Sequence, residues 1–111
     1  MEVAYETAKL AQLLADPRSL RRAYGAAVAK RLATRLSSIA AVGSLHELGT
    51  MPGRLHPLKG DRAGQFAMDL PDGWRLILKP AQPVPLLPDG GIDLRAVTAV
   101  TIADISRHYQ P

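Results

Sequence analysis

Hydrophobic residues recur along this chain with two spacings, and each spacing predicts a different kind of element. The clearest helical pattern is in residues 26–41, where the apolar positions are separated by four, four and three residues: Val28, Leu32, Leu36 and Ile39. That spacing places them on one face, and the segment is predicted to lie with this face on a sheet. Arg31 and Arg35 lie along one edge of the predicted helix, and we interpret both as solvent-facing in preference to RNA contacts. Residues 18–35 hold six basic residues and no acidic one, and this run is equally suited to receive an acidic partner segment.

Two shorter helical segments precede it. Thr7 is a suitable N-cap for residues 8–15, in which Leu10, Leu13 and Leu14 have helical spacing. The pair Asp16-Pro17 is a second start signal, with Asp as the cap and Pro at the first helical position. This segment is predicted to continue through Tyr24 and to end near Gly25.

Alternation of apolar and polar residues predicts the strands. Phe66, Met68 and Leu70 alternate with more polar or smaller neighbours, and residues 74–78 are predicted to be the hairpin partner across the turn at residues 71–73. Residues 2–6 predict a short strand, and residues 97–105 are rich in Val, Ile and Thr and predict a closing strand.

The order of these elements defines the expected fold. Helices precede most of the strands and the connections are short, which predicts an α+β fold with two N-terminal helices packed on a small, largely antiparallel β-sheet. Residues 80–91 contain four prolines and Asp89-Gly90-Gly91, and are expected to form an exposed loop. We find neither an internal repeat nor a linker, so residues 1–111 are expected to form a single domain.

The charge of the chain indicates a class of partner. Lys and Arg number 14 against 10 Asp and Glu, for a net charge of +4. The excess lies in residues 1–62, and a basic half is consistent with a polyanion such as nucleic acid. There is no cysteine, which excludes disulfides and thiol chemistry. No apolar run is long enough for a membrane span and the polar start is unlike a signal peptide, so we expect a cytoplasmic protein.

Candidate chemistry gathers around the hairpin. A surface histidine transfers protons near neutral pH, and Lys and Arg stabilise the charge that builds up on a phosphoryl group. RNA carries its own nucleophile, the 2′-hydroxyl, so its cleavage needs a base, an acid and cations. The residues that would supply them, if they converge, are His56, Lys59, Arg62 and Arg75, with His108 and Tyr109 from the end of the last strand.

Each of these residues also has a structural interpretation. His56 before Pro57 is compatible with a turn cap, Asp61 with an ion pair to Arg62, and Arg75 with a cross-strand pair to Asp69. His108 and Tyr109 are equally compatible with a frayed end. The three histidines are far apart and no glycine-rich nucleotide motif is present, so neither a metal nor a cofactor is expected.

One combination of motifs is more specific than these single residues. Residues 54–65 read RLHPLKGDRAGQ and residues 73–77 read GWRLI. The chain thereby resembles the HigB branch of the RelE-like toxins of bacterial type II toxin–antitoxin systems, whose members read L-H-P-L-K-G-D-R-x-G, a strand, and then W-R-[LI]-x-F. The resemblance extends over nearly the whole chain.

The resemblance implies a function. It implies an endoribonuclease that cleaves messenger RNA, usually on the ribosome, and leaves a 2′,3′-cyclic phosphate. It also implies a HigA-like helix-turn-helix antitoxin as the partner, with operator DNA bound only through that antitoxin.

It also implies roles for individual residues. His56 would transfer protons, and Lys59 and Arg75 would contact the scissile phosphate. The remaining basic residues near the motifs are expected to contact RNA or the ribosome: Arg54, Arg62, Lys79 and Arg107.

The C-terminal residues depart from the family pattern. Members commonly end in Asp-Tyr-His, whereas this chain has Arg107-His108-Tyr109. Neighbouring residues on a strand point to opposite faces, so the exchange is not neutral. It leaves open a local bulge that re-aims one of the two rings, an altered proton relay, or a catalytically weakened protein that acts as an antitoxin- or ribosome-binding module.

A further alternative is a basic RNA-binding domain without a toxin function. Such a domain needs aromatic side chains on which bases stack. The chain has few aromatic residues, and Tyr5 and Phe66 are expected to face inward. This alternative therefore ranks last.

Overall fold

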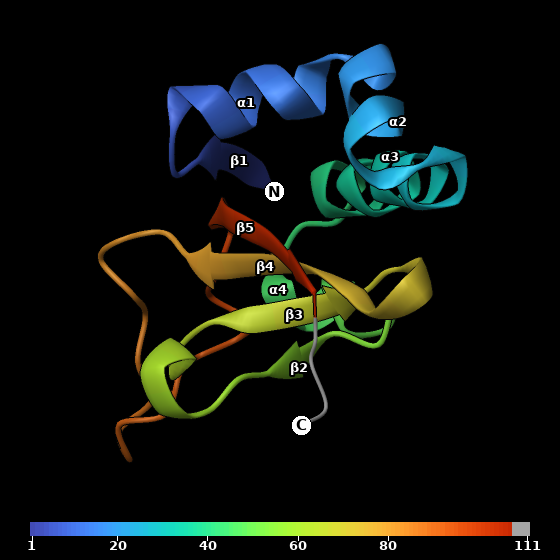
Figure 1. Ribbon diagram of the computed structural model, residues 1–111. Helices are drawn as coiled ribbons and strands as arrows, with labels where there is room; N and C mark the ends of the chain where they lie inside the picture. The colour runs from blue at the N-terminus through green and yellow to red at the C-terminus, as the bar shows by residue number, and fades with distance from the viewer. Residues whose placement is uncertain (108–111) are drawn as a thin grey trace.

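A five-stranded sheet forms the centre of the molecule. The computed structural model describes residues 1–107. Its strands are β1 (Glu2–Tyr5), β2 (His56–Pro57), β3 (Phe66–Asp69), β4 (Trp74–Pro80) and β5 (Ala99–Arg107). They lie in the order β1-β5-β4-β3-β2 (Figure 1). β1 is parallel to β5 and the other neighbouring pairs are antiparallel, so the predicted α+β class and largely antiparallel sheet are confirmed.

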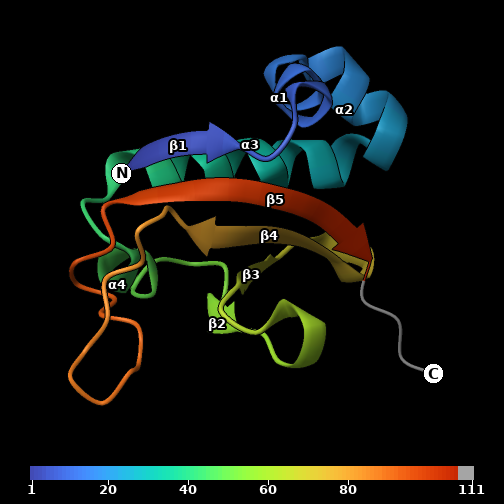
Figure 2. The same cartoon turned by 90° about the vertical axis from the view of Figure 1, so that its left-hand side faces the viewer.

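Helices cover one face of this sheet. They are α1 (Ala8–Ala15), α2 (Pro17–Tyr24), α3 (Ala26–Ala41) and the one-turn α4 (Leu45–Leu48). Figure 2 shows α3 lying along the sheet, with α1 and α2 on its outer side. The expectation of two N-terminal helices is not confirmed, because the described residues hold three helices before α4. Asp16 caps α2 through the Arg18 amide, and Gly25, with φ of 88°, separates α2 from α3.

The core lies between α3 and the sheet. Val28, Leu32 and Ile39 are buried and Leu36 is partly buried, so the predicted apolar face of α3 is confirmed. The sheet contributes Phe66, Met68, Leu70, Leu76, Leu78 and Ile102 to the same cluster. Burying these side chains is the main stabilising contribution to the fold.

The predicted hairpin is confirmed. Phe66 pairs with Leu78 and Asp69 with Arg75 across β3 and β4. The connection is a 3-10 turn, η2 (Pro71–Gly73), in which Asp72 has a φ of 59°. β4 then pairs with β5, with a register shift between Ile77 and Leu78.

Other expectations have mixed outcomes. Phe66 is buried as expected, but Tyr5 is 37% exposed at the edge strand, so its inward placement was wrong. β2 was not predicted because it has only two residues.

Residues 81–98 form the long projecting loop of Figure 2, which contains one isolated bridge between Leu86 and Ile92. No helix within residues 1–107 is long and apolar enough to cross a membrane.

Candidate functional site

The site residues lie on the sheet face opposite α3. Side chains alternate along a strand, so Arg75 and Ile77 point away from the face that Leu76 and Leu78 contribute to the core. Asp69 is opposite Arg75 in register, and His56 is opposite Ala67, two positions before Asp69. Strand register therefore brings His56, Asp69 and Arg75 to one face.

A concavity of about 310 Å³ opens beside these residues, at the end of the β3–β4 hairpin. It is lined by Arg54, His56, Asp69, Leu70, Gly73, Trp74 and Arg75. A histidine, two arginines, a carboxylate and an aromatic ring thus meet in one place. Its size is near the lower end of the range for ligand pockets.

The backbone orients the His56 ring. Its Nδ1 lies 2.8 Å from the carbonyl oxygen of Arg54. A carbonyl oxygen accepts only, so Nδ1 must carry the proton that it donates. In the neutral ring Nε2 is then unprotonated and able to accept a proton, which is the form required of a general base.

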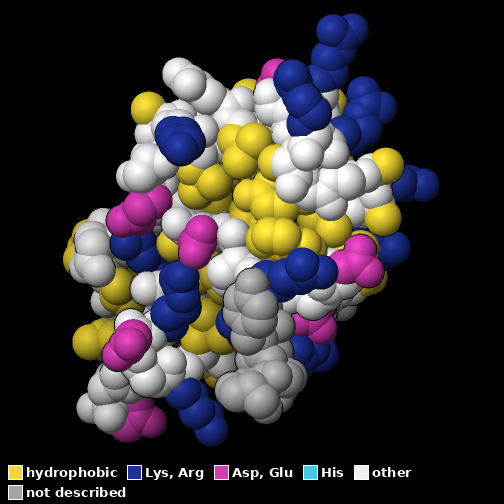
Figure 3. Space-filling view, viewed as in Figure 1, with side chains coloured by type: hydrophobic (Ala, Val, Ile, Leu, Met, Phe, Trp, Pro, Cys, Tyr) yellow, Lys and Arg dark blue, Asp and Glu magenta, His cyan; other side chains and the backbone are white. Residues whose placement is uncertain are grey.

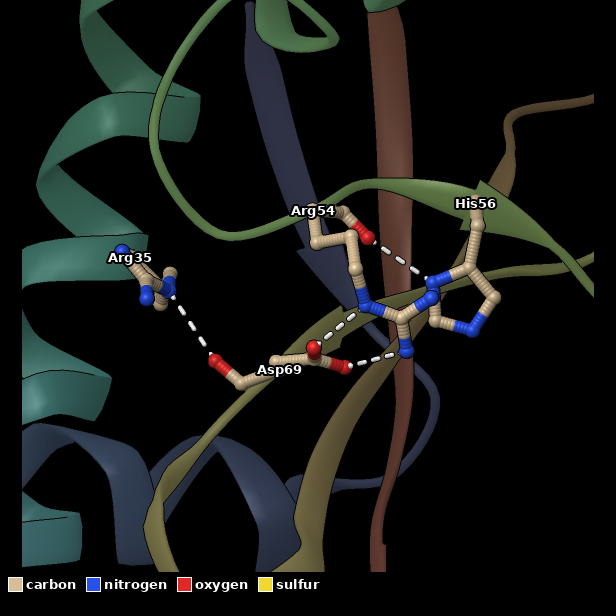
Figure 4. A network of polar contacts seen from close by, with 4 residues as sticks. All are labelled: Arg35, Arg54, His56 and Asp69. Carbon is tan, nitrogen blue, oxygen red and sulfur yellow. Dashed lines mark hydrogen bonds and ion pairs between the residues drawn. The ribbon is translucent and has the colours of Figure 1, made fainter.

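Arg54 and Asp69 form a bidentate pair beside the ring (Figure 4). The Arg54 Nε and Nη2 atoms donate to the two Asp69 carboxylate oxygens at 2.6 and 3.0 Å. The hydrogen bond from Arg54 lowers the pKa of Asp69, and the nearby His56 and Arg35 lower it further, while the same pair raises the pKa of Arg54. Arg54 has a φ of 51°, so its backbone occupies the left-handed region.

Arg35 supports this arrangement from the core side. It is 7% exposed, so the expectation that it faces solvent was wrong. Its Nε donates to the Asp69 carbonyl at 3.1 Å and its Nη1 to the Pro52 carbonyl at 3.2 Å. Burial lowers its pKa. These bonds tie the segment before Arg54 to β3.

Gly53 makes room for the Arg35 side chain. A Cβ atom at position 53 would lie 2.8 Å from the Arg35 Nε and 2.9 Å from the Met68 Cε. The Gly53 carbonyl also accepts a hydrogen bond from the Asp69 amide at 2.8 Å. Glycine is therefore required here both for space and for its φ of 126°.

Arg75 has an unused hydrogen-bond donor. Its Nε is buried and has no hydrogen-bond partner within residues 1–107. The interpretation of Arg75 as the ion-pair partner of Asp69 was wrong, because the Asp69 carboxylate bonds to Arg54. A buried donor without a partner costs about 1–3 kcal/mol, and a bound anion would recover that cost.

An aromatic cluster borders the same concavity. The Trp74 ring packs edge-on against Tyr24 with centroids 4.8 Å apart, and burial raises the pKa of Tyr24. The Arg107 guanidinium carbon lies 5.4 Å from the Trp74 ring centroid, and Arg107 Nε donates to the Asp72 carbonyl at 3.2 Å. Arg107 is therefore held at the edge of the concavity, opposite Trp74 in register.

Other predicted site residues lie outside the concavity. Lys59 is exposed just before the 3-10 turn η1 (Gly60–Arg62), and its side chain is not part of the lining. Arg62 bonds Gln65 and, at 2.8 Å, Asp104, so the expected Asp61–Arg62 pair is not formed. Lys79 pairs with Glu6 at 2.9 Å. The predicted residues His108 and Tyr109 lie outside the described residues.

Sequence reasoning missed three contributors. Asp69 was considered only as a partner for Arg75, Trp74 only as part of a motif, and Arg35 only as a solvated side chain. The hairpin register, read outward from residues 71–73, would have placed Asp69 beside Arg75. Nothing in the sequence distinguishes Arg35 from Arg31.

The described residues hold no candidate metal site. Residues 1–107 bring no three His, Cys, Asp or Glu side chains together.

Comparison with known proteins supports the fold. No protein-family model and no curated protein matches the chain. Among solved structures, the YoeB/ParE toxin from Agrobacterium tumefaciens is similar, with a TM-score of 0.60 and 12% sequence identity over 98% of this chain and 100% of that chain. The chain therefore has a fold of the RelE/ParE toxin type. The likeness does not single out the HigB branch.

Proposed function

We propose that this chain is the toxin of a bacterial type II toxin–antitoxin system and a metal-independent endoribonuclease. The observation that carries the proposal is the concavity in which the His56 Nε2 acceptor and the buried Arg75 donor are both available. The likeness of the fold to a protein described as a YoeB/ParE toxin supports it. The motifs at residues 54–65 and 73–77 favour the HigB branch.

The proposed reaction begins at His56. Its Nε2 removes the proton of a ribose 2′-hydroxyl, and the resulting oxygen attacks the adjacent phosphorus. The bond from phosphorus to the 5′-oxygen of the next nucleotide breaks, and that oxygen receives a proton from a general acid. The products are a 2′,3′-cyclic phosphate and a 5′-hydroxyl, and no metal ion takes part.

Charge in the concavity suits each step. The Arg75 guanidinium stabilises the negative charge that develops on the phosphoryl oxygens. When His56 takes up a proton, the Asp69 carboxylate stabilises the imidazolium, in keeping with the effect of His56 on the pKa of Asp69. Trp74 provides an aromatic surface for a neighbouring base.

The remaining predicted residues take supporting roles in this proposal. Lys59 reaches the phosphate from outside the lining, and His108 or Tyr109 supplies the proton to the leaving oxygen. Arg54, Arg62, Lys79 and Arg107 contact RNA or the ribosome. The substrate is messenger RNA, held on the ribosome, and the partner is a HigA-like helix-turn-helix antitoxin through which operator DNA is bound.

The test compares two histidines. Purified wild type, His56→Ala and His46→Ala are incubated with labelled RNA and with ribosome-bound messenger RNA in the presence of EDTA. His46 is exposed on α4 outside the concavity, so it is the matched control. We expect cleavage by the wild type and His46→Ala and a loss of about 100-fold or more in His56→Ala. Equal cleavage by all three would contradict the role of His56.

A second candidate is a binding module that does not cleave RNA. Three of the predicted RNA-binding cations are engaged by carboxylates: Arg54 with Asp69, Arg62 with Asp104 and Lys79 with Glu6. These pairs reduce the positive charge offered to RNA. Folded wild type that cleaves neither substrate, and does not arrest growth when expressed without its partner, would favour this candidate.

A further inference from the structure

We infer that Asp104 is a positioning residue of the site: through Arg62 it fixes the η1 turn, and with it Lys59, over the sheet face opposite α3. The inference rests on the proposed function, in which Lys59 reaches the scissile phosphate. Neither Asp104 nor Arg62 lines the concavity. Asp104 would therefore act on the reaction only through the turn.

Strand register places Asp104 on the same face as the site residues. One row of opposite residues runs across β2, β3, β4 and β5: His56, Ala67, Ile77 and Asp104. Side chains of opposite residues point to the same side of a sheet, so the whole row faces away from α3. Ser106, two residues after Asp104, is opposite Arg75. Asp104 therefore belongs to the row next to that of Arg75.

The η1 turn lies over this row. It is part of the connection between β2 and β3, and Figure 2 shows it, in yellow-green, on the side of the sheet away from α3. The Arg62 side chain extends from the turn to Asp104 on β5. Ala67 and Ile77, which lie between β2 and β5 in the row, are fully buried, although neither belongs to the core cluster beneath α3. Their burial is consistent with the turn and the Arg62 side chain covering the row.

The Arg62 guanidinium is held at both of its terminal nitrogens. Its Nη2 donates to Asp104 Oδ2 at 2.8 Å, and its Nη1 donates to Gln65 Oε1 at 3.0 Å. The other Asp104 oxygen accepts from the Ile105 amide at 2.8 Å, which orients the carboxylate. A charge-assisted hydrogen bond is stronger than a neutral one, so the Asp104 contact is the firmer of the two that Arg62 makes.

Backbone hydrogen bonds extend this constraint to Lys59. The Arg62 amide donates to the Lys59 carbonyl at 3.3 Å, and the Leu58 amide donates to the Gln65 carbonyl at 2.9 Å. The turn is thus closed on itself, and holding Arg62 also holds the backbone of Lys59. A misplacement of about 1 Å in a group that acts on the substrate can cost about 100-fold in rate.

The test combines a structural and a kinetic measurement. The variants are Asp104→Asn, Asp104→Glu, Arg62→Gln and the double variant of Asp104→Asn with Arg62→Gln. Hydrogen exchange of the amides that close the turn is measured by NMR: Leu58, Arg62, Ala63 and Gln65. The values of kcat and KM are measured for the RNA that the wild type cleaves. Circular dichroism verifies that each variant is folded.

The ion pair between Lys79 and Glu6 supplies the matched control. Its nitrogen and oxygen are 2.9 Å apart, against 2.8 Å for Arg62 and Asp104, and all four side chains are between 36% and 44% exposed. Figure 3 shows acidic side chains next to basic ones at the left of the view, so pairing of this kind recurs on the surface. Glu6→Gln removes one carboxylate, as Asp104→Asn does, but from a pair outside the turn.

We expect Asp104→Asn to lower kcat about 10- to 100-fold and to accelerate exchange of the turn amides about tenfold. Asp104→Glu keeps the carboxylate and should stay within about threefold of the wild-type kcat. The double variant should have the kcat of Asp104→Asn, because both substitutions break one contact, and any contact of Arg62 with RNA would change KM instead. Glu6→Gln should leave kcat and the exchange rates of the turn amides unchanged.

Three results would contradict the inference in different ways. Unchanged exchange in Asp104→Asn would overturn the fixing of the turn. Faster exchange with an unchanged kcat would overturn the role of the turn in the reaction. A lower KM with an unchanged kcat would assign Asp104 a purely electrostatic effect, since removing a carboxylate near RNA strengthens binding.

Failure of the proposed function would be recognised separately. A wild type that cleaves no RNA would overturn the endoribonuclease. The exchange rates in Asp104→Asn and Glu6→Gln would still decide whether Asp104 fixes the turn.

Discussion

Arg75 and Leu76 are neighbours on β4, and they belong to opposite faces of the same sheet. Leu76 is fully buried in the cluster that includes α3, while Arg75 lines a concavity with a buried donor that nothing in residues 1–107 engages. On the helix-covered face the buried Arg35 side chain has hydrogen-bond partners, and the apolar side chains pack into one cluster. On the open face the strands hold charged groups in fixed positions at a cost in stability, which is typical of binding and catalytic sites.

Arg35 and Arg75 extend this comparison to two arginines, of which Arg35 is buried and Arg75 is partly buried with a buried Nε atom. Arg35 lies on the core side and donates hydrogen bonds to two backbone carbonyl groups, so its role is structural. Arg75 lies on the other face and lines the concavity, and its buried Nε has no hydrogen-bond partner within residues 1–107, so we propose that its guanidinium binds a ligand. The same residue type thus has a structural role on one face and a proposed functional role on the other.

Removing Leu76 should have the largest effect on stability. Leu76→Ala leaves a cavity in the core, and we expect the free energy of unfolding to fall by about 2–5 kcal/mol. Denaturant unfolding measures it. Any RNA cleavage per folded molecule should be retained, since the side chain is absent from the concavity. A loss well below this range would show that the helix-covered face is less tightly packed than the structure indicates.

Removing Arg75 should have the opposite signature. We expect Arg75→Ala to lower RNA cleavage about 100- to 1,000-fold, because the charge that stabilises the transition state is lost. Stability should be unchanged or slightly higher, since a buried unsatisfied donor is removed. Cleavage rates and denaturant unfolding are measured together. A large drop in stability would indicate that Arg75 has a structural role instead.

Removing Arg35 should affect both faces. In Arg35→Leu the Asp69 and Pro52 carbonyls lose their donor, and we expect stability to fall by about 1–3 kcal/mol. The segment that carries Arg54 and His56 should also become more mobile. Faster hydrogen exchange of the backbone amides of residues 53–56, measured by NMR, would detect this change. Arg31→Leu, an exposed position on the same helix, should change stability by less than about 0.5 kcal/mol. Similar losses in the two variants would refute the special role of Arg35.

The smallest expected effect is the loss of stability at acidic pH that comes from the ion pair between Arg54 and Asp69. The pKa of Asp69 is lowered in the folded state by Arg54, so the pair contributes stability that is complete above about pH 5 and is lost as the pH falls below the ordinary aspartate value of about 3.9. The free energy of unfolding is measured at several pH values between about 6 and about 3, which span that pKa. It should fall less steeply with decreasing pH in Asp69→Asn than in the wild type. Arg54→Gln should reduce the slope in the same way. An unchanged slope in both variants would show that the pair contributes nothing measurable.

The repeating patterns were the parts that sequence reasoning predicted well. The apolar face of residues 26–41 and the alternation around residues 71–73 both appear in the structure, because burial of a helix face or a strand face imposes a period on the chain. The helical segments predicted for residues 8–15, for the stretch from Pro17 to Tyr24 and for residues 26–41 correspond to α1, α2 and α3, with the break at Gly25, whereas the statement of two N-terminal helices was not confirmed.

By itself the sequence determined the class of fold, the hairpin, and the presence of a histidine and several cations around it. Only the tertiary structure decided which of them meet: His56 and Arg75 share a concavity, Lys59 lies outside its lining, and Arg35 is buried beneath it. The physical reason is that periodicity is a local property that burial imposes along one segment. Convergence depends on strand register and on which carboxylate each cation reaches, and those partners are distant in the sequence.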